Sequence, residues 1–169
     1  MNLTTSLVLA LISLFGALHY QDSNEWFGRG LNAFNRGNYA EAVESYSKAL
    51  ELDSTAATTW FNRAAAYMRL RQFANAHADL DRCLVIFPGA ANMRMQRAIV
   101  RAEMGRFAEA LDDVGSVIRT DSTFPKARLL RGRILLTRFN DTIGACSDLR
   151  AALAIGDSTA LRYIRGTCQ

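Results

Sequence analysis

The same types of residue return along this chain at a fixed step of 34 residues. Aromatic, small and aliphatic positions recur together, and the first two copies pair Trp26 with Trp60, Gly30 with Ala64, Tyr39 with Phe73, Ala42 with Ala76, and Leu50 with Leu84. The step continues downstream, where Ala98, Phe107 and Ala110 repeat the pattern. A chain with this period folds as a row of similar units, because one unit alone cannot bury its apolar face.

The copy at residues 57–90 reads as two helices joined by a turn. Its first half places Trp60, Ala64 and Tyr67 at helical spacing. Its second half carries a longer apolar stripe made of Phe73, Ala76, Leu80, Cys83, Leu84 and Phe87. Pro88 then ends the second helix. Small residues such as Ala64 let the paired helices approach closely.

Residues 57–90 resemble the tetratricopeptide-repeat family. The residues that match its consensus are Trp60, Ala64, Tyr67, Ala76, Leu80, Cys83 and Pro88. The resemblance implies an all-α fold, a right-handed α-solenoid of about four helix-turn-helix repeats plus a C-terminal capping helix. The expected segments are repeat one at 23–56, repeat two at 57–90, repeat three at 91–124, a divergent repeat four at 125–157, and the capping helix at 158–169.

Residues 1–20 differ in character from the repeats. Residues 7–18 are apolar except at Ser13 and Gly16, and no charged side chain precedes Asp22. This length suits the core of a signal peptide and is short for a membrane span. We favour a cleaved signal peptide and therefore an exported protein of the periplasm or cell envelope. The alternatives are an uncleaved membrane anchor and an apolar cap on repeat one, and the alternative locations of the protein are the membrane and the cytoplasm.

Arginines also follow the 34-residue step. They stand at Arg29, Arg63, Arg97 and Arg131, and acids stand in the second helices of repeats two to four at Asp79, Asp113 and Asp148. A subset of tetratricopeptide repeats is similar, so we interpret these residues as a structural Arg–Asp ladder. Repeat one has Ser45 in place of the acid, which predicts that its arginine lacks this partner.

Repeat three carries arginines on one face of its first helix, at Arg94, Arg97 and Arg101. We favour a structural interpretation, in which their stems cover apolar surface and their heads reach water or nearby acids. The alternative is a site for an anion or a carboxylate.

Two cysteines flank the Gly156–Asp157 turn at similar distances. An antiparallel hairpin would place Cys146 and Cys168 side by side. The ending also resembles that of exported bacterial tetratricopeptide-repeat proteins, which have a final cysteine. We therefore predict a disulfide, which requires an oxidising compartment. The alternative is a pair of free thiols in a reducing cytosol.

The sequence gives little support for catalysis. Its two histidines are far apart, and it has no Gly-rich phosphate loop and no Cys-x-x-Cys motif. We therefore predict that the protein is not an enzyme and that it uses no cofactor or metal.

The resemblance instead implies a concave groove lined by the first helices of the repeats. The family's groove positions correspond to Phe61, Asn62, Ala65, Met95, Gln96, Ile99, Leu129 and Arg133. Such a groove would bind an extended peptide or a segment of a partner protein. The first repeat has Phe27 and Leu31 where members that bind chaperone tails have Lys and Asn, so the sequence does not favour that ligand.

The predicted function is therefore that of a non-catalytic adaptor or scaffold for a protein or peptide partner, as one component of a multi-protein envelope complex. One alternative is a structural subunit of a larger assembly. The other is a nucleic-acid-binding helical repeat that uses Arg128, Arg131, Arg133 and Arg138. Nucleic acid is not the expected partner, because the net charge of +4 is small. Membrane contact is expected only through residues 1–20, if they are not cleaved.

Overall fold

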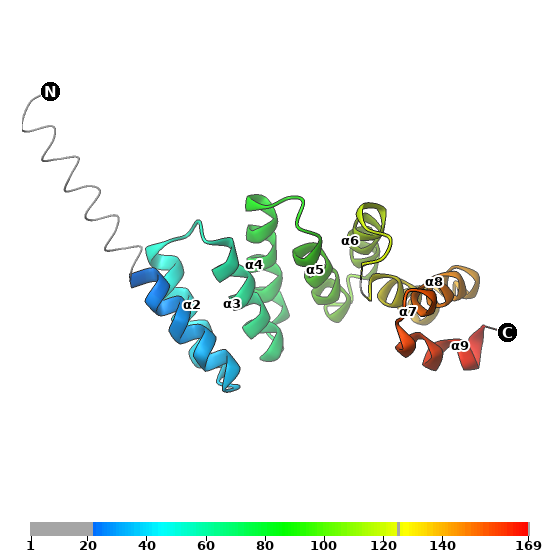
Figure 1. Ribbon diagram of the computed structural model, residues 1–169, viewed down its shortest axis with the longest axis horizontal. Coiled ribbons are helices and arrows are strands. Elements are labelled where there is room, and N and C mark those ends of the chain that lie inside the picture. The colour runs from blue at the N-terminus through cyan, green and yellow to red at the C-terminus, as the bar shows by residue number, and fades with distance from the viewer. Residues whose placement is uncertain (1–21, 125, 169) are drawn as a thin grey trace, which may run out of the picture. The chain divides into compact units, whose positions relative to one another are not determined.

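The computed structural model describes residues 22–124 and 126–168, and the predicted segment 1–20 lies outside these ranges. A helix covers residues 22–35. It is followed by α2 (Tyr39–Leu52), α3 (Ala57–Arg69), α4 (Phe73–Ile86), α5 (Ala91–Glu103), α6 (Phe107–Thr120), α7 (Ala127–Arg138), α8 (Thr142–Ala154), the 3-10 helix η1 (Ser158–Ala160) and α9 (Leu161–Thr167), as Figure 1 shows. The described ranges contain no strand, which confirms the predicted all-α fold class.

The chain divides into two compact units, and the division falls between Phe87 and Pro88. Within its described residues, the first unit contains the helix over residues 22–35 and α2 to α4. The second unit contains α5 to α9 and η1. Inside each unit, helices that follow one another in the chain pack together. None of the described helices combines the length and the apolar composition that a membrane span requires.

The core of the first unit shows why small residues recur in the repeats. Tyr46 is fully buried and packs with Ala33, Ala42 and Ala66. Its ring lies against Gly30, where a Cβ atom would come within 2.6 Å of the ring carbons. A side chain on the first helix would therefore push the two helices apart. Glycine at this position allows the bulky Tyr46 to fill the space between the helices.

The main cluster of the second unit is built from the inward faces of α5, α6 and α7. Its buried residues are Met95, Ala98, Ala110, Val114, Val117, Ile118, Ala127, Leu130 and Ile134. A separate cluster of Leu149, Ala152 and Ala160 connects α8 to η1, and residues of α9 pack against it. The terminal helix is therefore attached through this smaller cluster.

Most turns that follow these helices use a residue with positive φ. Gly37, Gly105 and Gly156 have φ values of +83°, +77° and +96°, and Arg71 takes the equivalent place after α3 with φ +58°. At Gly37 the amide donates to Phe34 O, and the next amide donates to Ala33 O, which is the Schellman arrangement. The turn after α7 differs, because Asn140 has the positive φ and the amide of Asp141 reaches back six residues to Leu135 O.

We expect Arg71→Gly to stabilise the protein by about 1 kcal/mol, because glycine adopts this backbone conformation without the steric cost that a Cβ atom imposes. Arg71→Ala is the matched control, since it removes the same long side chain but keeps the Cβ atom. The free energy of unfolding in urea, followed by circular dichroism, measures the difference. Equal stability of the two variants would show that the positive φ carries no strain.

A shared tripeptide shapes three of the connections between helix pairs. Asp-Ser-Thr occurs at residues 53–55, 121–123 and 157–159. In each copy the Asp carboxylate accepts hydrogen bonds from the backbone amide and the hydroxyl of the Thr; for Asp121 these are 2.8 Å and 2.7 Å long. The hydroxyl and then the amide of Thr123 lower the pKa of Asp121. The carboxylates thus set the turn that starts each following helix.

Candidate functional site

The arginines and acids that share the 34-residue step meet in the structure. In the first unit, Arg63 donates from Nε and Nη2 to the carboxylate of Asp79, with both distances 2.8 Å, and from Nη1 to Ser47 Oγ at 2.9 Å. The Asp79 side chain is only 5% exposed. Burial lowers the pKa of Arg63, but the hydrogen bonds and charge of Asp79 raise it, and the net shift is upward.

In the second unit, each of two buried carboxylates binds two arginines. Asp113 accepts from Arg97 and from Arg101, both at 2.7 Å. Asp148 accepts from Arg131 at 2.5 Å and from Arg128 at 3.2 Å. Hydrogen bonding to this acid raises the pKa of Arg131, with burial opposing it. These four arginines are therefore used within the fold.

The other arginines of this pattern also have internal partners. Arg94 donates to the backbone carbonyl of Pro88, so the three arginines on the face of α5 all bind groups of their own unit. The structural interpretation of that face is therefore preferred to the anion site. Arg29 pairs with Glu25 of its own helix at 2.6 Å and lies over the Trp26 ring.

The eight predicted groove residues are divided between the units. Phe61, Asn62 and Ala65 lie on α3 in the first unit and are half-buried, and the Asn62 amide donates to Thr58 O. The other five lie in the second unit, on α5 and α7. These five residues differ widely in exposure, and their exposure decides which of them a partner could reach.

The prediction that Met95 lines a groove is wrong. Its side chain is 5% exposed and belongs to the core of the second unit. Ile99 packs partly against the same core, and Leu129 packs against the small cluster beneath α9. Gln96 is half-buried, whereas Arg133 is exposed. Packing between helices of the unit thus takes up most of the apolar positions expected to face a partner.

Arg133 does line a hollow of about 560 Å³ within the second unit, which we call the second-unit groove. The volume lies in the range of ligand pockets. Its walls come from α5, the turn after it, α6, α7 and α9, and its lining residues are Ala102, Glu103, Gly105, Phe107, Arg133, Ile134, Thr137, Arg138 and Tyr163.

The second-unit groove combines apolar and aromatic side chains with two exposed guanidinium groups and the exposed carboxylate of Glu103. Ile134 is buried, and Phe107 and Tyr163 are half-buried. Arg138 stacks over the Phe107 ring at 4.7 Å. Neither Arg138 nor Arg133 forms an ion pair with any residue in the described ranges, unlike the arginines bound to Asp113 and Asp148. The groove can therefore accept an apolar side chain next to a carboxylate.

Sequence reasoning missed most of this groove. The sequence presents Phe107 only as a position of the repeat pattern and Arg138 only as a contact of the nucleic-acid alternative. Tyr163 follows the last repeat, so the 34-residue step gives no signal for it. The clustering of basic residues in 125–169, eight against three acids, was the sequence feature that pointed to this part of the chain.

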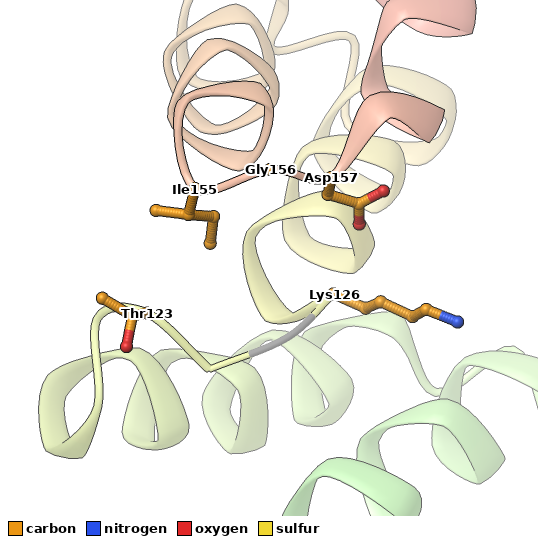
Figure 2. Close-up of a pocket in the computed structure, with 5 residues that line it drawn as sticks. All are labelled: Thr123, Lys126, Ile155, Gly156 and Asp157. Carbon is orange, nitrogen blue, oxygen red and sulfur yellow. The ribbon is translucent and has the colours of Figure 1, made fainter.

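A smaller hollow of about 280 Å³ also lies in the second unit, between the turn before α7 and the turn after α8 (Figure 2). Figure 2 shows Thr123 and Ile155 on one side of it, with Lys126 and Asp157 extending on the other. One oxygen of Asp157 already accepts from Thr159. None of the described residues that line this hollow is aromatic, and its volume is half that of the second-unit groove. The larger groove is therefore the better candidate for a binding site.

A disulfide joins Cys146 on α8 to Cys168 after α9, with 5.5 Å between their Cα atoms. The predicted pair is therefore present. The third cysteine, Cys83, is fully buried, and its thiol approaches Ala57 O at 3.4 Å. Burial, followed by the charge of Asp79, raises the pKa of Cys83 to about 12, so this thiol stays protonated at neutral pH.

Comparison with known proteins identifies the repeats in part of the chain. A family model for TPR repeats matches residues 30–70, and the model for the tetratricopeptide repeat matches residues 57–90. This chain contains tetratricopeptide repeats. The tetratricopeptide repeat and J domain-containing co-chaperone DNJ1 of Cryptococcus neoformans is 35% identical over 86 residues, which cover 51% of this chain and 16% of that protein. Matches to the curated relatives span 11% to 21% of their length.

Solved structures of tetratricopeptide-repeat domains agree with this fold. The first TPR of Spaghetti (RPAP3), bound to the HSP90 peptide SRMEEVD, is 25% identical with a TM-score of 0.65, covering 68% of this chain and 91% of that one. MamA has a TM-score of 0.76 at 19% identity, covering 83% of this chain and 81% of that one, and this likeness concerns the fold alone. Among the described residues, no three metal-ligating side chains gather in one place.

Proposed function

We propose that this tetratricopeptide-repeat chain is a non-catalytic protein-interaction adaptor, and that its second-unit groove binds an extended segment with an apolar side chain beside a carboxylate. The observation that carries the proposal is the pair of arginines at the groove, Arg133 and Arg138, which have no acidic partner in the described ranges. Apolar contact would supply affinity, and the guanidinium groups would select the acid.

The wider charge distribution supports an acidic partner. Residues 88–169 carry thirteen basic and eight acidic side chains, whereas residues 1–87 carry seven and eight. The positive charge of the protein is therefore concentrated in the unit that holds the groove, where it would speed the approach of an acidic segment. Among the similar proteins, one is a co-chaperone and another is bound to a peptide with acidic and apolar residues, which supports a peptide partner.

The test uses immobilised heptapeptides that each contain one Glu and one Leu or Phe. The spacing between these two residues is varied across the set, and a matched set has Gln in place of Glu. We expect the protein to prefer the Glu peptides and Arg133→Glu to weaken this binding about tenfold or more, with a smaller effect at high salt. The exposed Arg119 lies on α6 and lines no part of the groove, so Arg119→Glu is the charge-matched control.

Equal binding of the Glu and Gln peptides, or equal loss of binding in the two arginine variants, would contradict the proposed site. Circular dichroism of both variants checks that the helices remain intact. Because Arg133 is exposed, its substitution should leave the fold unchanged.

The same observations weaken the nucleic-acid alternative. Of its four candidate contacts, Arg128 and Arg131 already bind Asp148.

We also propose that the adaptor is an exported protein. The disulfide supports this, because such bonds persist in oxidising compartments.

A further inference from the structure

The C-terminal helix contributes to the groove but is weakly held. Helix α9 has seven residues, and none of them is buried. Half-buried Tyr163 and Ile164 rest on the cluster of Leu149, Ala152 and Ala160. Beyond this contact, the end of the helix is held by the disulfide and by a hydrogen bond of 3.1 Å from Arg150 to the Cys168 carbonyl. A short helix with so little buried surface depends strongly on a covalent link.

Tyr163 is the residue of α9 that lines the second-unit groove. It stands five positions before Cys168, and the disulfide joins the end of its helix to α8. If the end of α9 is released, the Tyr163 ring loses its fixed place in the groove that Phe107, Arg133 and Arg138 also line. The amphipathic ring can offer both an apolar face and a hydroxyl to a bound segment.

We propose that Tyr163 contacts the partner and that the Cys146–Cys168 disulfide sets its position, so that the oxidised protein binds more tightly than the reduced one. This inference rests on the proposed function of the groove.

Reduction of the Cys146–Cys168 disulfide needs a reductant, and we assign that role to a dithiol. One thiolate of the dithiol attacks Sγ of Cys168, which is the less buried of the two cysteines, and Cys146 leaves as a thiolate that is then protonated. The second thiol of the reductant displaces Cys168 from the mixed disulfide. Two electrons and two protons thus pass to the protein, which gains two thiols, while the dithiol becomes a disulfide. Cys83 takes no part, because it is buried.

The experiment compares oxidised protein with protein reduced by dithiothreitol. The probe is the immobilised Glu heptapeptide that retains the oxidised protein best. We expect reduction, the double variant Cys146→Ser/Cys168→Ser, and Tyr163→Ala each to weaken binding about tenfold. Reduction of Tyr163→Ala should cause little further loss, because the side chain positioned by the disulfide is already gone. Arg165→Ala, an exposed position on α9 outside the groove, is the control.

Hydrogen exchange gives a readout that needs no peptide. Reduction should speed exchange of the amides of α9 while those of α5 to α7 stay protected. Native thiol labelling should detect two new thiols after reduction. The intact mass of the same sample reports whether residues 1–20 are still attached.

The outcomes separate the two proposals. If the oxidised protein prefers no Glu peptide, the proposed function is wrong and this inference falls with it. If Glu peptides bind equally well to oxidised and reduced protein, or if exchange in α9 does not change on reduction, this inference alone is wrong. Tighter binding by the oxidised form, lost in Tyr163→Ala, supports it.

Discussion

Replacing Asp113 with asparagine should lower the free energy of unfolding by about 3 kcal/mol or more. The carboxylate is 4% exposed and accepts hydrogen bonds from Arg97 and Arg101, whose side chains are 16% and 14% exposed. Its neutralisation removes the buried charge that both guanidinium groups share, and Glu109, whose carboxylate lies 3.7 Å from Arg101, is a more distant and more exposed acid. Urea denaturation followed by circular dichroism measures the loss.

The neighbouring Asp112 provides the control for this prediction. It is exposed, so Asp112→Asn removes the same charge from the same helix without breaking a buried contact. We expect its effect to remain within about 0.5 kcal/mol. A comparably small effect of Asp113→Asn would show that the arginines find water or other acids when the carboxylate is lost.

Replacing Met95 with glutamate should destabilise the second unit by about 3–5 kcal/mol. The side chain is packed among the buried apolar residues of α5, α6 and α7, where a carboxylate would lose its hydration. We therefore expect unfolding to reach its midpoint at a much lower urea concentration. The helical circular-dichroism signal should fall in proportion to the fraction of molecules that is unfolded. A binding assay on this variant would report unfolding rather than recognition.

Gln96→Glu introduces the same charge one position later on α5, at a half-buried residue. It should change stability by less than about 1 kcal/mol. If Met95→Glu were as stable as Gln96→Glu, Met95 would have to be accessible, as expected for a residue that lines a groove.

The repeat architecture could be predicted from the sequence because its signals are local. The small residue at Gly30 or Ala64 and the aromatic at Tyr39 or Phe73 act within one helix pair, and the 34-residue step shows them several times. The Arg–Asp contacts are predictable for the same reason, since Arg63 and Asp79, like Arg97 and Asp113, lie sixteen residues apart within a helix pair.

The exposure of individual apolar residues could not be predicted in this way. Met95 and Arg133 were both assigned to a groove from the family pattern, yet one is in the core and the other at the surface. A helix has several faces, and the face that is buried depends on the helices of the next pair. In the second unit, α5 also approaches α7, and Met95 fills the space beside Ile134 and Leu130.

The sequence by itself therefore determined the helical class, the period of the repeats, the charge pairs within them and the two cysteines of the bridge. Each of these depends on spacing along the chain, which the 34-residue step or a single hairpin sets. Only the tertiary structure decided which arginines are used internally and which remain available, and that Tyr163 joins Arg133 and Arg138 in one groove. These properties depend on packing between helices that are distant in sequence, for which no local pattern exists.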